Sequence, residues 1–192
     1  MITIPVEISA RHMHISEADF KTLFGPQATL AAAANLSQTG EFASDHFVTL
    51  KNGERKIEKV RILGPFREQT QVEVSFTDAR YLRATVPLRL SGDLSGSAPV
   101  QLISPAGVEL ELGEGMIVAR RHLHVAPAEA NRYNLVDGQE VSLRVAGERG
   151  GQLDHCLVRV KENYQASFHV DTDEANALGL KKDQVGELII PN

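Results

Sequence analysis

The sequence has a single cysteine, no tryptophan and few aromatic residues, which make up 5% of its 192 positions. One cysteine, Cys156, excludes an internal disulfide and favours a reducing compartment. No apolar run approaches the ~18 residues that a membrane-spanning helix needs. The first residues, Met1 to Glu7, lack the basic and apolar regions of a signal peptide. We therefore expect a cytoplasmic protein with no membrane partner.

An excess of basic residues is also absent. Lysine and arginine number 20 and aspartate and glutamate 25, so the formal net charge is −5. Sequence-independent binding to nucleic acids needs a basic surface. This composition therefore argues against nucleic acid as a partner.

The hydrophobic pattern of the sequence predicts mostly short strands separated by turns. Hydrophobic residues make up 42% of the chain, enough for a sizeable core in one medium domain or two small ones. Asn52-Gly53 lies between two β-rich runs and predicts a hairpin, because both residues tolerate a positive φ. We predict a mainly β fold with short capping helices. The predicted strands are 5–10, 47–50, 57–63, 71–76, 86–90, 100–103, 115–120, 140–145, 156–160, 165–170 and 187–190, and the predicted helices are 16–24, 77–83, 126–133 and 172–178.

An internal repeat is the most informative feature. Arg11-His-Met-His14 recurs 110 residues later as Arg121-His-Leu-His124. Glu73-Val-Ser-Phe-Thr-Asp-Ala79 resembles His169-Val-Asp-Thr-Asp-Glu-Ala175, 96 residues later. The two motifs come in the same order in each half, which predicts two related subdomains, approximately residues 1–95 and 96–192. The period is too long for a solenoid.

The repeated His-x-His motif predicts metal binding. On a strand, side chains two residues apart point to the same face, about 7 Å from each other. Duplicated spacing favours metal ligands over the common alternatives for an isolated histidine, which are caps, turns and hydrogen-bonded core positions. Three protein ligands per metal leave an open coordination position, as in catalytic zinc sites. The predicted ligand sets are His12, His14 and Glu73 in one half, and His122, His124 and His169 in the other.

Three other features have alternative interpretations. Arg67 lies six residues before Glu73, and its forked donors suit phosphate or carboxylate, although most single arginines are merely exposed. The Ser/Gly-rich stretch 91–97 is consistent with either a linker or a binding loop. Cys156 lies outside both repeats, so an idle thiol is a simpler interpretation than a nucleophile.

Several motifs in collinear order resemble the PduL-type phosphate acyltransferases, the phosphate propanoyltransferase family. The resemblance covers nearly the whole chain. The runs that carry it are Val6 to His14, Leu36 to Phe42, Val60 to Arg67, Thr70 to Glu73, Leu90 to Asp93, Arg121 to His124 and His169 to Asn176.

This resemblance implies two β-barrel-like subdomains, two Zn²⁺ ions per chain held by the six predicted ligands, and interconversion of acyl-CoA plus phosphate with acyl phosphate plus CoA. Propanoyl-CoA and acetyl-CoA are the implied acyl donors, and Arg67 is the implied phosphate contact. From the residues themselves we favour direct transfer over a covalent enzyme intermediate, because no Ser-His-Asp set is visible and Cys156 lies outside every motif. A homodimer is our expectation. The resemblance associates the chain with propanediol degradation and the bacterial microcompartment, although no N-terminal encapsulation helix is visible. The implied coenzyme A contacts are Ile8, Ser9, Ala10, Arg61 and Asn176.

Two other functional classes stay open at this point. One is a zinc hydrolase acting on a thioester or phosphoester. The other is a non-catalytic β protein with structural zinc, which the three-ligand sets disfavour because structural sites normally have four protein ligands.

Overall fold

A computed structural model describes residues 1–191 of the chain. This part is mainly β with four short helices, which confirms the predicted fold class. No helix within these residues combines the length and apolar character needed to cross a bilayer. The strands form two closed rings of six, which we call the N-barrel and the C-barrel.

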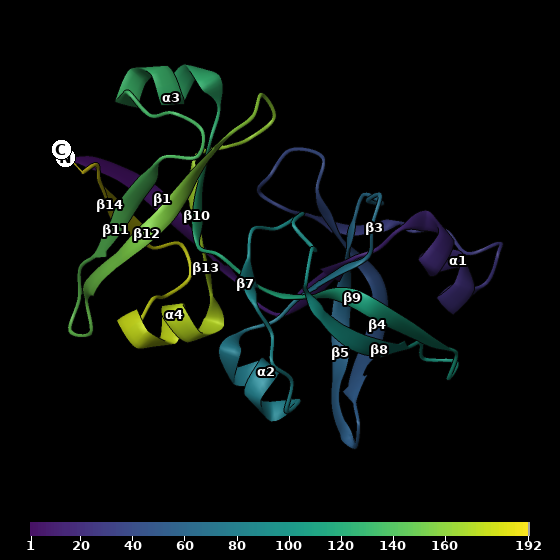
Figure 1. The fold of residues 1–192 in the computed structure, drawn as a ribbon. Coiled ribbons are helices and arrows are strands. Elements are labelled where there is room, and N and C mark those ends of the chain that lie inside the picture. The colour runs from purple at the N-terminus through teal and green to yellow at the C-terminus, as the bar shows by residue number, and fades with distance from the viewer. Residues whose placement is uncertain (192) are drawn as a thin grey trace. The chain divides into compact units, whose positions relative to one another are not determined.

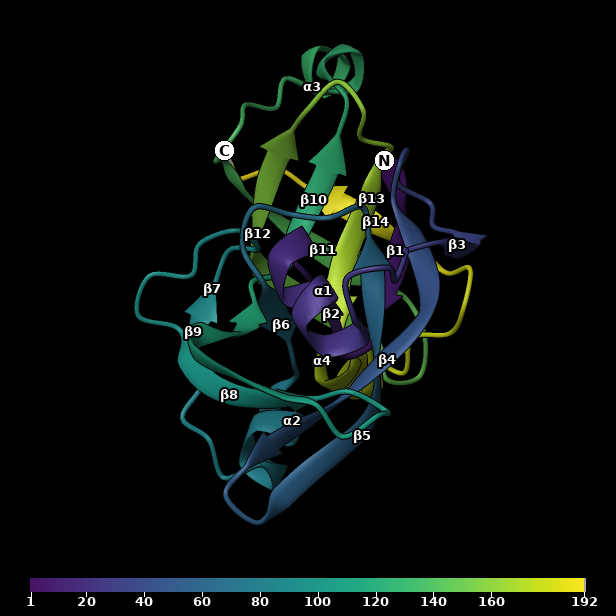
Figure 2. The same ribbon diagram turned by 90° about the vertical axis from the view of Figure 1, so that its right-hand side faces the viewer.

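The N-barrel closes in the order β4-β5-β2-β6-β9-β8, because β8 pairs with both β9 and β4. Figure 2 shows its long strands. Two accessory strands extend it: β3 (Ala32–Asn35) pairs with β4, and β7 (Leu88–Arg89) pairs with β9. The ring consists of β2 (His12–His14), β4 (Phe42–Asn52), β5 (Arg55–Gly64), β6 (Gln71–Glu73), β8 (Ala98–Ile103) and β9 (Glu109–Ala119).

The C-barrel closes in the order β1-β13-β10-β12-β11-β14. The first strand of the chain, purple in Figure 1, lies between β13 and β14, which are among the last. The members are β1 (Ile2–Ser9), β10 (His122–Val125), β11 (Glu140–Val145), β12 (Gly151–Val160), β13 (Ser167–Asp171) and β14 (Val185–Ile189).

Both barrels share one pairing scheme. In each, the His-x-His strand pairs in parallel with one neighbour and antiparallel with the strand that carries the third predicted ligand. The strand that leads into each His-x-His motif, however, closes the opposite barrel. β1 precedes β2 but pairs with β13 and β14, while β9 precedes β10 but pairs with β6 and β8.

This exchange of leading strands explains how the chain divides. Residues 1–10 form one compact unit with the segment that begins at Arg120, and Arg11–Ala119 form the other. The predicted boundary between residues 95 and 96 divides the chain at a different place. β8 and β9 lie beyond that boundary yet pair within the N-barrel, and β1 lies before it yet pairs within the C-barrel.

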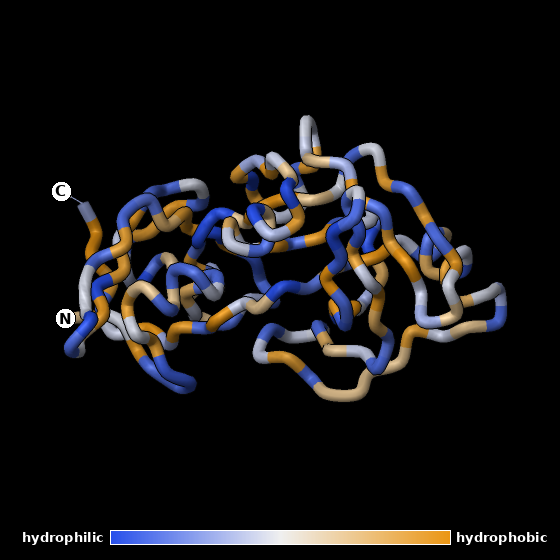
Figure 3. The backbone as a smooth tube through the Cα atoms, turned by 90° about the horizontal axis from the view of Figure 1, so that it is seen from below, coloured by the Kyte–Doolittle hydropathy of each residue, from blue (hydrophilic) through white to orange (hydrophobic). Residues whose placement is uncertain are grey.

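Each barrel encloses its own apolar core, and hydrophobic and hydrophilic stretches alternate along the chain, as Figure 3 shows. The central residues of the two His-x-His motifs, Met13 and Leu123, point inward and are fully buried. Because side chains alternate along a strand, the flanking histidines lie on the outer faces of the barrels.

All four predicted helices are present, namely α1 (Glu17–Phe24), α2 (Phe76–Tyr81), α3 (Pro127–Tyr133) and α4 (Thr172–Leu178). Two of them, α2 and α4, each begin three residues after a predicted third ligand, Glu73 and His169 respectively. Ser75 and Asp78 form a capping box on α2, and Asp171 and Glu174 form the equivalent box on α4. Each box satisfies backbone N–H groups that the first turn of a helix leaves unpaired.

One glycine of the C-barrel has no room for a side chain. A Cβ at Gly186 on β14 would overlap Leu143 Cδ1 and lie 3.2 Å from the Arg144 carbonyl oxygen. We expect Gly186→Ala to destabilise the protein by about 1–3 kcal/mol through overpacking. The midpoint of urea unfolding should fall accordingly.

Gly113 on β9 is the matched control, because a Cβ there would meet nothing within 4 Å. Gly113→Ala should leave the midpoint unchanged or slightly raised. Equal midpoints for the two variants, measured in the same metal state, would contradict the packing argument.

Candidate metal centres

The first group of predicted ligands comes together on the outer face of the N-barrel. We call His12, His14 and Glu73 the first trio. His12 lies directly opposite Glu73 in the antiparallel pairing of β2 with β6, and the His12 Nε2 to Glu73 Oε2 distance is 3.6 Å. One potential ligand atom from each of the three lies within 4.8 Å of the others.

The second trio, His122, His124 and His169, repeats this arrangement in the C-barrel. His122 lies opposite His169 in the antiparallel pairing of β10 with β13. The three ring centroids are 4.4–4.9 Å apart, and the potential ligand atoms again lie within 4.8 Å of one another. Tyr164 stacks on the His124 ring, with 3.7 Å between ring centroids.

Both trios fit a bound metal ion. His14 Nδ1 and both ring nitrogens of His124 are buried and have no hydrogen-bond partner within residues 1–191. Buried polar atoms are normally paired, so a metal would satisfy them. Ligand atoms about 2.0–2.2 Å from a tetrahedral zinc lie about 3.4 Å apart, and modest side-chain movements would bring the trios to that spacing.

The protonation states also favour metal binding. Burial lowers the pKa of His14 well below its usual range, and the nearby positive charge of Arg67 lowers it further. Burial likewise lowers the pKa of His124, and the charges of His169 and His122 add to the effect. Both imidazoles are therefore neutral at pH 7, with a lone pair available for a metal. His122 Nδ1 lies 2.9 Å from the Arg120 carbonyl oxygen, a contact of the kind that orients a metal-ligating imidazole.

A guanidinium group ties each His-x-His strand to the helix that follows the third ligand. Arg11 contacts both carboxylate oxygens of Asp78, at 2.9 and 2.8 Å. Arg121 Nε lies 2.7 Å from Glu174 Oε1. Both acidic residues are capping-box members, so the two halves contain the same ion pair at equivalent positions. Both arginines belong to the repeated motif, but nothing in the motif itself predicts this role for them.

Arg67 is connected to the first trio by a short chain of hydrogen bonds. Its guanidinium donates to Ser91 Oγ at 3.1 Å, and its backbone N–H donates to the Ile15 carbonyl oxygen at 3.0 Å. Gln71 Nε2 donates to Ser91 Oγ at 2.9 Å and to Glu73 Oε1 at 2.6 Å. The structure thus places Arg67 in one network with Glu73, and it places the Ser/Gly-rich stretch beside them.

Glu41 adds a weaker contact, because one of its carboxylate oxygens lies 3.6 Å from the Arg67 guanidinium. Both groups are partly exposed, so this pair contributes little to stability.

The predicted coenzyme A contacts belong to different parts of the fold. Ile8 and Ser9 lie at the end of β1, Ala10 follows it, and Ile8 is exposed. Arg61 lies opposite His12 on β5, and its guanidinium donates to the Ser44 carbonyl oxygen. The same guanidinium stacks over Phe47, 4.4 Å from the ring centroid. Asn176 lies exposed on α4.

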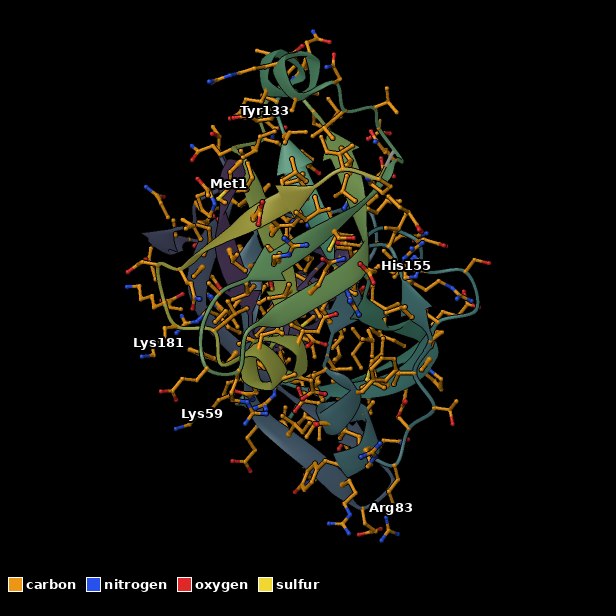
Figure 4. All side chains as sticks on the ribbon, turned by 90° about the vertical axis from the view of Figure 1, so that its left-hand side faces the viewer. Met1, Lys59, Arg83, Tyr133, His155 and Lys181 are labelled. Atoms are coloured by element: carbon orange, nitrogen blue, oxygen red, sulfur yellow. The ribbon has the colours of Figure 1, made fainter. Side chains whose placement is uncertain are left out.

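The two histidines outside the repeats join neither trio. His155, labelled in Figure 4, is exposed, and its Nδ1 lies 2.8 Å from Glu140 Oε2. His46 packs edge-on against the rings of Phe20 and Phe24. Neither belongs to a group of three potential metal ligands within residues 1–191.

Cys156 is buried in the core of the C-barrel. Burial raises the pKa of its thiol to about 12. A thiol is nucleophilic only as the thiolate, so this side chain is inert in the folded protein.

Comparison with known proteins gives consistent matches over nearly the whole chain. Residues 5–181 match the family model described as phosphate propanoyltransferase. The chain is 46% identical over 183 residues to the phosphate propanoyltransferase of Shewanella putrefaciens, covering 95% of this chain and 86% of that protein. It is 45% identical over 188 residues to that of Escherichia fergusonii, covering 97% and 89% of the two chains.

The buried thiol generates a test of the C-barrel core. At pH 8, a thiol-labelling reagent should react with Cys156 in the folded protein at least about tenfold more slowly than in urea-unfolded protein, where the thiol returns to an ordinary pKa near 8.5. Mass spectrometry after timed quenching measures both rates. Equal rates would show that Cys156 is accessible and reactive.

Proposed function

Because this chain belongs to the phosphate propanoyltransferase family, we propose that it moves the acyl group of propanoyl-CoA or acetyl-CoA onto inorganic phosphate, with zinc bound at both trios. The chain is an acyltransferase of the phosphotransacylase type. In the reaction, a phosphate oxygen forms a bond to the thioester carbonyl carbon, the C–S bond breaks, and coenzyme A leaves as the thiolate.

The two trios are the proposed zinc ligands. The first offers two imidazoles and one carboxylate, and the second offers three imidazoles. Nitrogen and carboxylate donors with a fourth position open suit catalytic zinc. Bound zinc supplies Lewis-acid polarisation of a carbonyl or phosphoryl oxygen and accepts a soft thiolate.

Arg67 is the proposed phosphate ligand. The observation that carries the proposal is its connection to the first trio through Ser91 and Gln71. A guanidinium offers two parallel donors that match two phosphate oxygens, and the charge-assisted bonds fix the direction of attack. Its nearby charge also helps to keep His14 neutral.

We propose direct transfer without an acylated enzyme. Cys156 is the only cysteine, and burial raises the pKa of its thiol to about 12. A cysteinyl intermediate is therefore disfavoured, and phosphate itself is the proposed nucleophile. For coenzyme A, the proposed contacts remain Ile8, Ser9, Ala10, Arg61 and Asn176.

Release of free coenzyme A from acyl-CoA tests the proposal, monitored with a thiol reagent in the presence and absence of phosphate. We expect release to depend on phosphate and to yield acyl phosphate, detectable as its hydroxamate. Release at the same rate without phosphate would instead identify a thioester hydrolase. A series of acyl-CoA chain lengths in the same assay identifies the preferred donor.

The first prediction from this proposal concerns metal content. Elemental analysis of purified protein should find about two zinc ions per chain, one for each three-ligand set. His12→Ala and His122→Ala should each lose about one, and the double variant should lose both.

His155→Ala is the control, since this exposed histidine joins neither trio. It should keep the full metal content. Active protein without any transition metal would contradict the zinc proposal.

The second prediction concerns Arg67. Arg67→Ala should lower kcat/KM for phosphate, because it removes a charge-assisted contact to the reacting group. The loss should correspond to transition-state stabilisation on the order of 2–4 kcal/mol. Arg67→Lys should recover only part of this loss, since lysine keeps the charge without the fork. Steady-state kinetics with varied phosphate measure both effects, and zinc content should stay at the wild-type level.

Arg80→Ala provides the control, because this arginine is exposed on α2. Its phosphate kinetics should equal those of the wild type. Unchanged phosphate kinetics in Arg67→Ala would remove Arg67 from the proposed site.

A further inference from the structure

Gln71 is buried, with 1% of its surface exposed, and lies two residues before Glu73 on β6. The two side chains therefore share the outer face of the strand. Gln71 Nε2 donates to Glu73 Oε1 at 2.6 Å and to Ser91 Oγ at 2.9 Å. Gln71 Oε1 accepts from the backbone N–H of Gly92 at 2.7 Å. Both ends of the amide are thus used.

These partners fix the orientation of the amide. The Gly92 N–H is a donor and must face the amide oxygen. The amide nitrogen then faces the Glu73 carboxylate, which accepts. Rotating the amide by 180° would place two donors together at Gly92 and two acceptors together at Glu73. A single orientation is compatible with both neighbours.

The two oxygens of the Glu73 carboxylate consequently have different neighbours. Oε1 is held by Gln71, and Oε2 faces His12 Nε2 at 3.6 Å. Resting on the zinc site of the proposed function, we propose that Gln71 is a positioning residue that makes Glu73 a monodentate metal ligand through Oε2. It also joins that ligand to Ser91, which Arg67 contacts.

The other barrel supports this assignment independently. Ser167 is two residues before His169 on β13, as Gln71 is before Glu73 on β6, and it is also buried. Its Oγ lies 2.9 Å from His169 Nε2. Both trios therefore have a hydrogen-bonding side chain at the same position, although the residue types differ. Such partners orient metal ligands and commonly affect metal affinity.

A structural role alone would have a different effect. If Gln71 only filled space, an apolar side chain of similar length would preserve metal binding. If it orients Glu73, that replacement removes the hydrogen bond to Oε1 and allows both carboxylate oxygens to approach the metal. The metal affinity and the coordination number at the first trio would then change while the fold is retained.

The experiment measures zinc affinity of Gln71→Met by competition with a chromogenic chelator. Each trio is observed alone, in a His122→Ala background for the first and a His12→Ala background for the second. We expect the affinity of the first trio to fall about 10–100-fold and that of the second to stay unchanged. Ser167→Ala should lower the affinity of the second trio and leave that of the first unchanged.

Gln101→Met is the matched control. Gln101 also donates to a glutamate, with Nε2 at 2.8 Å from Glu109 Oε2, but on the exposed surface of the N-barrel. This variant should keep wild-type affinity at both trios. Cobalt substitution adds a spectroscopic readout, because a bidentate Glu73 would raise the coordination number and weaken the visible absorption of cobalt in the first trio of Gln71→Met.

Thermal unfolding of the metal-free protein tests whether each variant is folded. If Gln71→Met does not fold, Gln71→Asn replaces it, because its shorter amide cannot reach both Glu73 and Gly92. A folded variant with wild-type affinity and an unchanged cobalt spectrum would overturn the inference. Metal titration requires no turnover, so this outcome is distinct from failure of the proposed acyl transfer, which the phosphate-dependence assay detects.

Discussion

Both trios depend on one register of antiparallel strand pairing. β2 meets β6 with His12 opposite Glu73, and β10 meets β13 with His122 opposite His169. A slip of one residue would turn every side chain of a strand to the other face. The inward positions of Met13 and Leu123 prevent this, because a slip would expose them and bury the histidines in apolar cores. The hydrophobic effect therefore holds the ligands in place.

The two halves share this strand register but differ in the charge of their ligand sets. The first trio contains a carboxylate and lies near a guanidinium, whereas the second contains three imidazoles, one of which stacks against the ring of Tyr164. With a divalent ion bound, the first set would carry about one positive charge and the second about two. Anionic ligands would consequently experience different fields at the two sites. The Arg11–Asp78 and Arg121–Glu174 ion pairs occur in both halves, so they are not part of this difference in charge.

The sequence predicted the elements more readily than their partners. Duplication exposed the six residues of the trios, because ligands at repeated offsets stand out from the other histidines. The helices α2 and α4, with their capping residues, could be predicted because they also belong to the repeat. β3, with its alanine-rich sequence, has no counterpart between α3 and β11 and carries no alternating pattern. The contacts of Gln71 with Ser91 and Gly92 join residues about twenty positions apart, so local patterns contain no trace of them. The exchange of β1 and β9 was likewise not predictable, since either barrel offers a suitable apolar surface.

That exchange has a consequence for synthesis on the ribosome. β1 emerges before every other strand of the two barrels, yet both of its partners, β13 and β14, are the last two of these strands. At about 5–20 residues per second, roughly 10–30 s pass between the synthesis of β1 and that of its partner strands. β9 is the last strand of the N-barrel, so all strands of this barrel are synthesised while β1 still lacks its partner strands. The nascent chain must tolerate an unpaired strand edge throughout this interval, and β1 carries Pro5 and Glu7, residue types that discourage pairing between exposed edges.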